Sequence, residues 1–199
     1  IMLANTPASF EPSLDYVVAK VARFPFDKFA DANNKLSTQM KATGEVMSIG
    51  RTLEECFLKA VRSLEIGVCH IYMKKFDNMD TNEILTYIKD GTDDRLYAIG
   101  DLIRRGVDLG VICNATQIDM LFLDKIKNII DYETVVKNNK FDETVLYIAK
   151  RMGFSDKFIS ILWNEDELYV YNMRKSNGIF PVYKMVDTCH TNAYIPYFY

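Results

Sequence analysis

The chain has 199 residues and a mass of 23.0 kDa, enough for one large domain or for one domain and part of another. Hydrophobic residues make up 49% and charged residues 26%, which is typical of a folded domain and excludes a disordered or low-complexity chain. The net charge of −3 provides no electrostatic attraction to nucleic acid or to an anionic membrane. No apolar run reaches the roughly 18 residues that a membrane-spanning helix requires.

Residues 1–66 combine strand and helix patterns. Residues 15–24 (DYVVAKVARF) and 44–50 (GEVMSIG) each predict a strand, and Pro25 ends the first because it has no amide to donate. Thr52 is expected to cap a helix, with Glu55 reaching back to the Thr52 amide. The helix should end near Gly67, and its apolar residues recur at steps of three and four: Leu53, Cys56, Phe57, Ala60, Val61 and Leu64.

From residue 67 onward nearly every pattern is helical. We expect helices from Asp80 to Gly91, from Asp93 to Gly106, over 107–115, from 116–119 to about 138, over 142–152, over 155–162 and from Asn164 to Gly178. The inner face of the longest should hold Ile118, Phe122, Ile126, Ile129 and Ile130.

Short connections and one-sided apolar stripes require these helices to pack on one another. The expected fold is therefore mainly α, a helical domain preceded by a short α/β piece. Residues 181–199 should be extended. Neither end of the chain looks natural, since IMLANTPASF carries no signal peptide and AYIPYFY is abruptly aromatic, so we interpret both as cuts through a longer chain.

The sequence holds no phosphate-binding glycine loop, no nucleophile motif and no zinc-protease motif. The four cysteines are scattered without a CxxC pair, which favours reduced cytoplasmic thiols (Cys56, Cys69, Cys113 and Cys189). With His70 and His190 as the only histidines, a zinc site is not expected.

Several residues nevertheless admit a chemical interpretation beside a structural one. The helix start at Thr52 could hold an anion, or simply be capped by Thr52 and Glu55. The stretch from Asp77 through Asp80 to Glu83 faintly resembles a calcium loop, but its spacing favours a helix cap.

One basic pair and two thiol-containing pairs have the same ambiguity. Arg104-Arg105 could grip a carboxylate or phosphate, but more often such a pair is solvated or sits at a helix C-terminus. Cys69-His70 and Cys189-His190 could form nucleophilic pairs, but structural histidines are favoured. Trp163 and the tyrosines could stack on nucleic acid, but core and interface roles are preferred because no basic stripe accompanies them.

Long stretches of the chain resemble one enzyme family. TPASFEPSLDYVVAKVARFPFDKF (6–29), LSTQMKATGEVMSIGRTLEECFLKAVRSLEIG (36–67) and PVYKMVDTC (181–189) are similar to the large subunit of carbamoyl phosphate synthetase. DDRLYAIGDLIRRG (93–106) and NATQIDMLFLDKIKNI (114–129) are similar to the helical oligomerisation domain that links its two synthetase halves.

The resemblance implies three segments. Residues 1–66 would be the C-terminal portion of the first ATP-grasp (carboxyphosphate) unit, 67–180 the oligomerisation domain, and 181–199 an extended linker into the second half. The parent would be a glutamine-dependent, cytoplasmic ligase that makes carbamoyl phosphate from bicarbonate, ammonia and two ATP for arginine or pyrimidine biosynthesis. It would use ATP with Mg or Mn and potassium.

The resemblance carries no catalytic, cofactor or metal residue onto this chain, because the ATP-binding and metal-holding residues of the family would precede Thr6. The expected partners are a second copy, the rest of the large chain and the small glutaminase subunit, without nucleic acid or membrane. We expect Ile84 and Ile88 to face outward as the self-association surface; the alternative is that both are core. A free-standing helical interaction module remains the alternative function, and a small metal-dependent enzyme is a third.

Overall fold

A two-stranded antiparallel sheet opens the structure, a computed structural model that describes residues 11, 14–26, 33–41, 44–186 and 197–199. Strand β1 (Val17–Arg23) pairs with β2 (Gly44–Gly50), Val17 opposite Gly50 and Arg23 opposite Gly44. Along β1, half-buried and exposed residues alternate, because successive side chains point to opposite faces of a strand. One face of the sheet therefore packs on the rest of the protein, and both predicted strands are confirmed.

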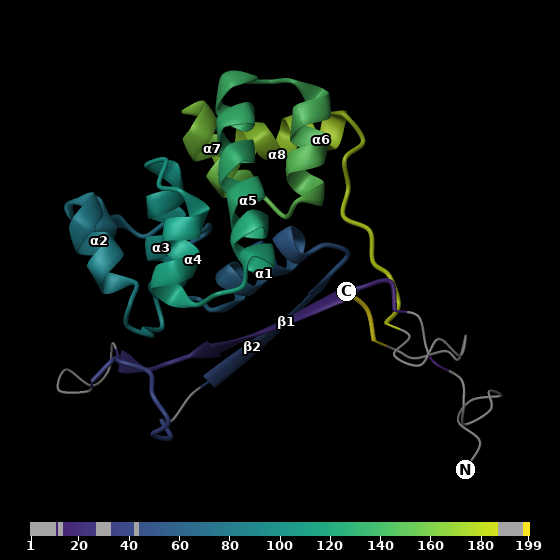
Figure 1. Cartoon of the computed structure of the whole chain (residues 1–199). Coiled ribbons are helices and arrows are strands. Elements are labelled where there is room, and N and C mark those ends of the chain that lie inside the picture. Colours follow the sequence, from purple (N-terminus) through teal and green to yellow (C-terminus); the bar gives the residue numbers. More distant parts are fainter. Residues whose placement is uncertain (1–10, 12–13, 27–32, 42–43, 187–196) are drawn as a thin grey trace, which may run out of the picture.

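Helix α1 (Leu53–Ser63) lies between this sheet and the other helices (Figure 1). Its Cys56 thiol donates to the Val17 carbonyl of β1 at 2.9 Å, while Leu58 is fully buried on the side of the helical bundle. The helix is thus covered on two faces, more than the single stripe that the sequence predicted. It ends at Ser63, earlier than the expected Gly67, and Glu65 takes a left-handed conformation with φ 53° just after it.

The helical bundle follows in chain order. A short 3-10 turn, η2 (Lys74–Phe76), precedes seven α-helices in the described residues: α2 (Thr81–Tyr87), α3 (Arg95–Arg104), α4 (Leu109–Thr116), α5 (Met120–Asn138), α6 (Glu143–Arg151), α7 (Asp156–Trp163) and α8 (Glu167–Ser176). Helix α5 occupies the centre and contacts α1, α3, α4, α6 and α7. The prediction of a mainly α chain preceded by a short α/β piece is confirmed.

Side-chain caps begin most of these helices, as the sequence predicted. Asp119, Asp142 and Ser155 each accept a hydrogen bond from a backbone amide in the first turn of the helix that follows. The prediction for the last helix was wrong: Asp166 caps α8, accepting from the Leu168 amide at 2.7 Å. Asn164 instead takes the left-handed conformation that ends α7, so it cannot begin the next helix.

The expected inner face of α5 is confirmed at Ile126, Ile129 and Ile130 and differs at Phe122. Phe122 is 41% exposed, whereas its neighbour Leu123 is fully buried beside Ile126 and Ile130. Both residues satisfy a helical spacing to Ile126, so periodicity alone could not select between them. The packing of α5 against α3 and α7 turns Leu123, and not Phe122, toward the core.

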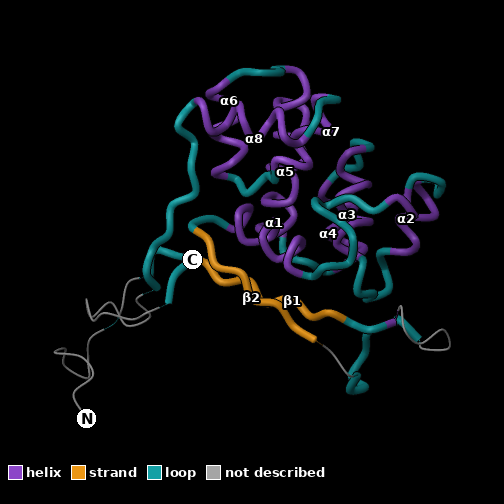
Figure 2. The backbone as a smooth tube through the Cα atoms, turned by 180° about the vertical axis from the view of Figure 1, so that it is seen from behind, coloured by secondary structure: helices purple, strands orange, loops and turns teal. Residues whose placement is uncertain are grey.

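After α8 the chain leaves the bundle in an extended conformation and returns to the sheet, as Figure 2 shows from behind. Met185 forms an isolated antiparallel bridge with Phe198, close to the start of β1. The extended conformation predicted after Gly178 is confirmed for residues 180–186.

Candidate functional site

The acidic residues before α2 form a helix cap. Asp80 Oδ1 accepts from the Glu83 amide at 2.8 Å, and Glu83 Oε2 accepts from the Asp80 amide at 2.7 Å. The Asp77 carboxylate accepts from the Tyr72 hydroxyl at 2.6 Å. The two bonds between Asp80 and Glu83 form a capping box, so the cap interpretation is confirmed.

The start of α1 is also closed by its own side chains. Thr52 Oγ1 accepts from the Glu55 amide at 3.2 Å, as expected. Glu55 Oε2 accepts from the amide of Arg51 at 2.9 Å, one residue before the expected Thr52 amide. The capping interpretation is therefore confirmed, except that the Glu55 side chain bonds to the amide of Arg51 and not to that of Thr52. Among the residues that the structure describes, no group of three or more His, Cys, Asp or Glu side chains is arranged to hold a metal ion.

A buried ionic group joins α3, α5 and the segment before η2. The Arg104 guanidinium donates to Glu133 through Nε at 2.8 Å and through Nη2 at 2.6 Å, and the same Nη2 donates to the Ile71 carbonyl at 2.6 Å. His70 Nε2 lies 2.9 Å from Glu133 Oε1, and its ring stacks on Phe158 with centroids 3.7 Å apart. Arg104 does grip a carboxylate, but one from its own chain.

The protonation states of this group follow from its surroundings. Burial lowers the pKa of His70 more than the bond to Glu133 raises it, so the imidazole is held neutral. A carboxylate only accepts, so Nε2 carries the proton, and the buried Nδ1 has no hydrogen-bond partner among the described residues. Burial alone would raise the pKa of Glu133, but the bonds from Arg104 and His70 hold it below its usual value. Glu133 therefore stays ionised and His70 structural.

Arg105 is exposed and is the C-cap residue of α3, as expected of a basic residue at a helix C-terminus, and its guanidinium bonds to groups of its own chain. Its Nη1 donates to the Met79 carbonyl at 2.8 Å and its Nη2 to the Phe76 carbonyl at 3.0 Å. Its Nε pairs with Asp101 one turn earlier at 2.7 Å. Arg105 thus ties η2 and the turn after it to α3.

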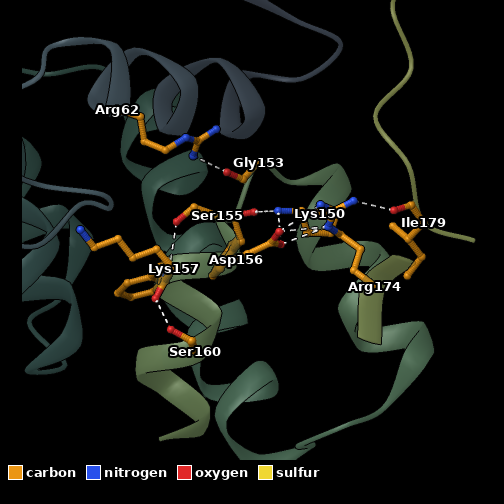
Figure 3. Close-up of polar contacts among 11 residues, drawn as sticks. Arg62, Lys150, Gly153, Ser155, Asp156, Lys157, Ser160, Arg174 and Ile179 are labelled. Carbon is orange, nitrogen blue, oxygen red and sulfur yellow. Dashed lines mark hydrogen bonds and ion pairs between the residues drawn. The ribbon is translucent and has the colours of Figure 1, made fainter. Parts of the chain in front are cut away.

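A second ionic group, shown in Figure 3, fixes the last three helices to one another. Asp156 Oδ1 lies 2.9 Å from Lys150 Nζ of α6, and Asp156 Oδ2 lies 3.1 Å from Arg174 Nη2 of α8. Burial raises the pKa of Asp156, but bonds from Lys150 and Arg174 outweigh it and lower the pKa overall. Arg174 Nη1 also donates to the Ile179 carbonyl at 2.7 Å, so the group holds the start of the returning segment.

Gly153, in the loop before α7, lies against α1. Arg62 Nη1 donates to the Gly153 carbonyl at 2.5 Å (Figure 3). Gly153 has φ 93°, and a Cβ there would lie 3.2 Å from the Glu55 Cα and 3.3 Å from the Leu58 Cβ. Only glycine combines this backbone conformation with this contact.

The returning segment is held at the sheet. Lys184 exchanges two backbone hydrogen bonds of 3.0 Å with Tyr199, and the Val186 amide donates to the Tyr197 carbonyl at 2.8 Å. The Lys184 ammonium bonds to the Asp15 carboxylate just before β1. Lys59 of α1 lies 5.6 Å from the Tyr199 ring centroid. The described C-terminal residues therefore lie beside the start of the sheet, although the chain leaves the bundle at the far end of α8 (Figures 1 and 2).

The expected outward stripe of α2 is not found. Ile84 and Ile88 are both 0% exposed, because α2 packs on α3 and contributes its stripe to the core. The alternative, that both residues are core, describes their position, and the prediction that they face outward was wrong.

The remaining candidates have structural positions. Trp163 is fully buried and its Nε1 donates to the Val136 carbonyl at 2.8 Å, which confirms a core role. His70 bonds to Glu133 rather than to its neighbour Cys69, whose thiol pKa is raised by burial. The pair Cys189-His190 lies outside the described residues.

Exposed apolar side chains lie on several helices, including α5, α6 and α8. Leu168 is 63% exposed and Tyr171 is 39% exposed. Both line an open hollow of about 560 Å³ together with the carboxylates of Asp156, Asp166 and Glu167. Of these three acidic residues, Asp156 is paired with Lys150 and Arg174, and Asp166 caps α8.

Sequence reasoning missed Glu133 and Asp156. Glu133 follows Ile126, Ile129 and Ile130 at helical spacing, so a charged residue on the buried stripe of α5 was the available signal. Asp156 had no comparable signal, because its partners Lys150 and Arg174 lie on other helices.

A comparison with known families identifies a match over the larger part of the chain. The model of the oligomerisation domain of the carbamoyl-phosphate synthetase large chain matches residues 45–178, from within β2 to the end of the bundle.

Among the described residues, none of the helices combines the length and the apolar character that a membrane-spanning helix needs.

Proposed function

The chain belongs to the oligomerisation-domain family of the carbamoyl-phosphate synthetase large chain, and we propose that it joins the two synthetase halves and mediates self-association without an active site of its own. The synthetase is a ligase, and the family description implies self-association. The observation that carries the linking role is the return of residues 179–186 to the sheet, where Lys184 bonds to Asp15.

Rigid attachment is what a linking module requires. Helix α1 is buried against both the sheet and the bundle, and Arg62 and Gly153 join it to the loop before α7. At the far end, Arg174 fixes Ile179 as the chain leaves α8. Entry and exit are thus tied to one framework, which would transmit the position of one half to the other.

The segment assignment belongs to the same proposal. Residues 1–66 would be the end of the first ATP-grasp unit, 67–180 the oligomerisation domain and 181–199 the linker into the second half. The outer face of the sheet, where Val18 and Met47 are exposed, would continue into the ATP-grasp unit. The parent reaction would be the ATP-dependent synthesis of carbamoyl phosphate from bicarbonate and glutamine-derived ammonia in the cytoplasm, for arginine or pyrimidine biosynthesis.

The nucleotide, the magnesium or manganese and the potassium of that reaction would bind outside this chain, and the small glutaminase subunit would contact the assembled enzyme. The polar side chains described above support this proposal because their hydrogen bonds are made to other groups of the same chain. Arg104, Arg105 and Arg174, which could otherwise hold phosphate, each donate to carboxylates or carbonyls of the chain.

Distances between spin labels test the linking role. A ketone-bearing amino acid at Met47 of β2 and at Tyr147 of α6 allows labelling without touching the cysteines, and both positions are exposed. A second pair joins Met47 to Val182 of the returning segment. Narrow distance distributions for both pairs are expected. A broad distribution for either pair would contradict a rigid connection.

A further inference from the structure

We propose that Asn177 is a site of spontaneous deamidation, and that the contact between Arg174 and Ile179 controls the rate of this reaction. Asn177 is followed by Gly178 at the point where the chain leaves α8, and this is the only Asn-Gly pair in the sequence. The inference concerns covalent chemistry of the backbone and does not depend on the proposed function.

The reaction joins an asparagine side chain to the next backbone amide. The Gly178 nitrogen attacks Cγ of Asn177, the Cγ–Nδ2 bond breaks, and Nδ2 leaves as ammonia with the proton of the Gly178 amide. Water then opens the resulting five-membered imide, leaving its oxygen on the attacked carbon and returning a proton to the nitrogen. Attack at Cγ gives aspartate, whereas attack at the backbone carbonyl carbon gives isoaspartate. Glycine favours the first step because it has no Cβ to hinder the approach.

Both reacting groups are accessible in the fold. Gly178 is exposed and Asn177 is half-buried. A Cβ built at Gly178 would meet nothing within 4 Å, so there is open space around the attacking nitrogen. The side-chain amide of Asn177 makes no hydrogen bond to another described residue, so it can turn toward Gly178.

The turn at the end of α8 restrains the attacking nitrogen. The Gly178 amide donates to the Lys175 carbonyl at 3.1 Å, and the Ile179 amide donates to the Arg174 carbonyl at 3.0 Å. With Gly178 at φ 69°, these are the two bonds of a Schellman motif, which ends a helix at a left-handed glycine. The Gly178 nitrogen must leave its bond to Lys175 before it can attack, so the turn has to open first.

Arg174 keeps this turn closed because it holds both polar backbone groups of Ile179. Its carbonyl accepts from the Ile179 amide, and its Nη1 donates to the Ile179 carbonyl at 2.7 Å (Figure 3). Its Nη2 lies 3.1 Å from Asp156 Oδ2, which fixes the guanidinium in place. Ile179 is also buried against the hydrophobic core. Opening the turn therefore requires Ile179 to leave Arg174, and this step limits the reaction.

Deamidation weakens the attachment of the returning segment. An aspartate at position 177 places a negative charge at the C-terminus of α8, where the helix dipole disfavours it. Isoaspartate adds a carbon to the main chain before Gly178, so the two bonds of the Schellman motif no longer fit together. The Ile179 amide should therefore exchange its hydrogen faster in the deamidated protein than in fresh protein. Equal exchange in the two would overturn this loosening.

Incubation of the whole chain in mildly alkaline buffer made with heavy-oxygen water tests the proposal, because the water that opens the imide leaves its oxygen at position 177. Digestion with trypsin in ordinary water gives the fragment Ser176–Lys184, whose only side-chain amide is that of Asn177. Mass spectrometry of this fragment measures the label. A synthetic peptide of residues 171–184 gives the rate without the fold. The folded wild type should react at least tenfold more slowly than the peptide.

Two matched variants test the control by Arg174. Arg174→Met should react at least threefold faster than the wild type, because it loses the bond to the Ile179 carbonyl. Lys175→Met removes a neighbouring positive charge but leaves that bond, so it should react like the wild type. Circular dichroism melting measures the stability of each variant. Gly106→Ala, at a left-handed glycine after α3, should lower stability without speeding the reaction, which separates the effect of Arg174 from a general loss of stability.

The results that would overturn the proposal are distinct. If the peptide is converted completely while neither the wild type nor Arg174→Met takes up any label, Asn177 is not a deamidation site of the folded chain. If the wild type reacts as fast as the peptide, or Arg174→Met no faster than Lys175→Met, the contact between Arg174 and Ile179 does not control the rate.

Discussion

Glu133 of α5 receives two nearly parallel hydrogen bonds from the Arg104 guanidinium of α3, from Nε to Oε2 at 2.8 Å and from Nη2 to Oε1 at 2.6 Å. Because the carboxylate is also bonded to His70, one buried charge joins three segments of the bundle. Breaking a buried pair is costly, since the remaining charge keeps its desolvation penalty without its partner.

The variant Glu133→Gln should lower the free energy of unfolding by about 3–5 kcal/mol, because it leaves the Arg104 charge uncompensated. Urea unfolding followed by circular dichroism measures the loss. Asp131→Asn, in the same helix and in an exposed pair with Lys127, is the matched control and should cost less than about 1 kcal/mol. Equal losses in the two variants would show that the Glu133 group does not hold the bundle together.

The stability of the chain should fall as the pH falls through the ordinary titration range of histidine. The folded pKa of His70 is lowered by burial, so below about pH 6.5 the unfolded chain binds a proton that the folded chain does not. The free energy of unfolding should then decrease by up to about 1.4 kcal/mol per pH unit. His70→Gln, which can still donate to Glu133 but does not titrate, should flatten this slope.

Urea unfolding of the wild type and of His70→Gln between about pH 7.5 and about pH 5.5 measures how the free energy of unfolding of each depends on pH. The carboxylates of Glu133 and Asp156, whose pKa values are lowered, stay ionised throughout this range. Those carboxylates contribute stability that is lost only at lower pH, as they protonate. A wild type and a His70→Gln variant with the same pH dependence would contradict a neutral, buried His70.

Gly153→Ala should destabilise the chain more than an alanine at another glycine of positive φ. At Gly153 a Cβ meets the α1 backbone at 3.2 Å, whereas at Gly106, with φ 79°, nothing lies within 4 Å. Gly106→Ala should cost about 1–2 kcal/mol from the left-handed conformation alone, and Gly153→Ala about 1–3 kcal/mol more from the contact. Thermal unfolding of the two variants compares them. Similar unfolding midpoints for the two variants would show that Gly153 is not in tight contact with α1.

Lys184→Glu should release the returning segment with little loss of overall stability, because its pair with Asp15 is exposed. The readout is hydrogen exchange at the Val186 amide, which donates to Tyr197 and should exchange faster in the variant. The double variant Asp15→Lys with Lys184→Glu should restore slow exchange. If Lys184→Glu leaves the exchange rate unchanged, the ion pair is not what holds the segment.

Much of the fold is readable from the sequence because local signals decide it. Both strands, the caps Thr52, Asp80 and Ser155, and the order of the helices follow from short patterns whose physics is contained in a few residues. The family could also be read from long motifs, and its match confirms it.

What the sequence could not supply was the side of each helix that the rest of the chain covers. Ile84 and Ile88 form an apolar stripe that suits either a core or an interface, and the packing of α2 on α3 makes it core. Phe122 and Leu123 differ by one position, and only the packing of α5 places the first outside. Ion pairs between different helices, such as Lys150 of α6 with Asp156 of α7, have no local sequence pattern that predicts them.

Isothermal titration of the whole chain with MgATP tests the central claim most directly, that this chain connects and assembles but holds no nucleotide itself. The account predicts heats of dilution only, up to millimolar nucleotide, with no change in melting temperature. A saturable isotherm with a micromolar dissociation constant would contradict it.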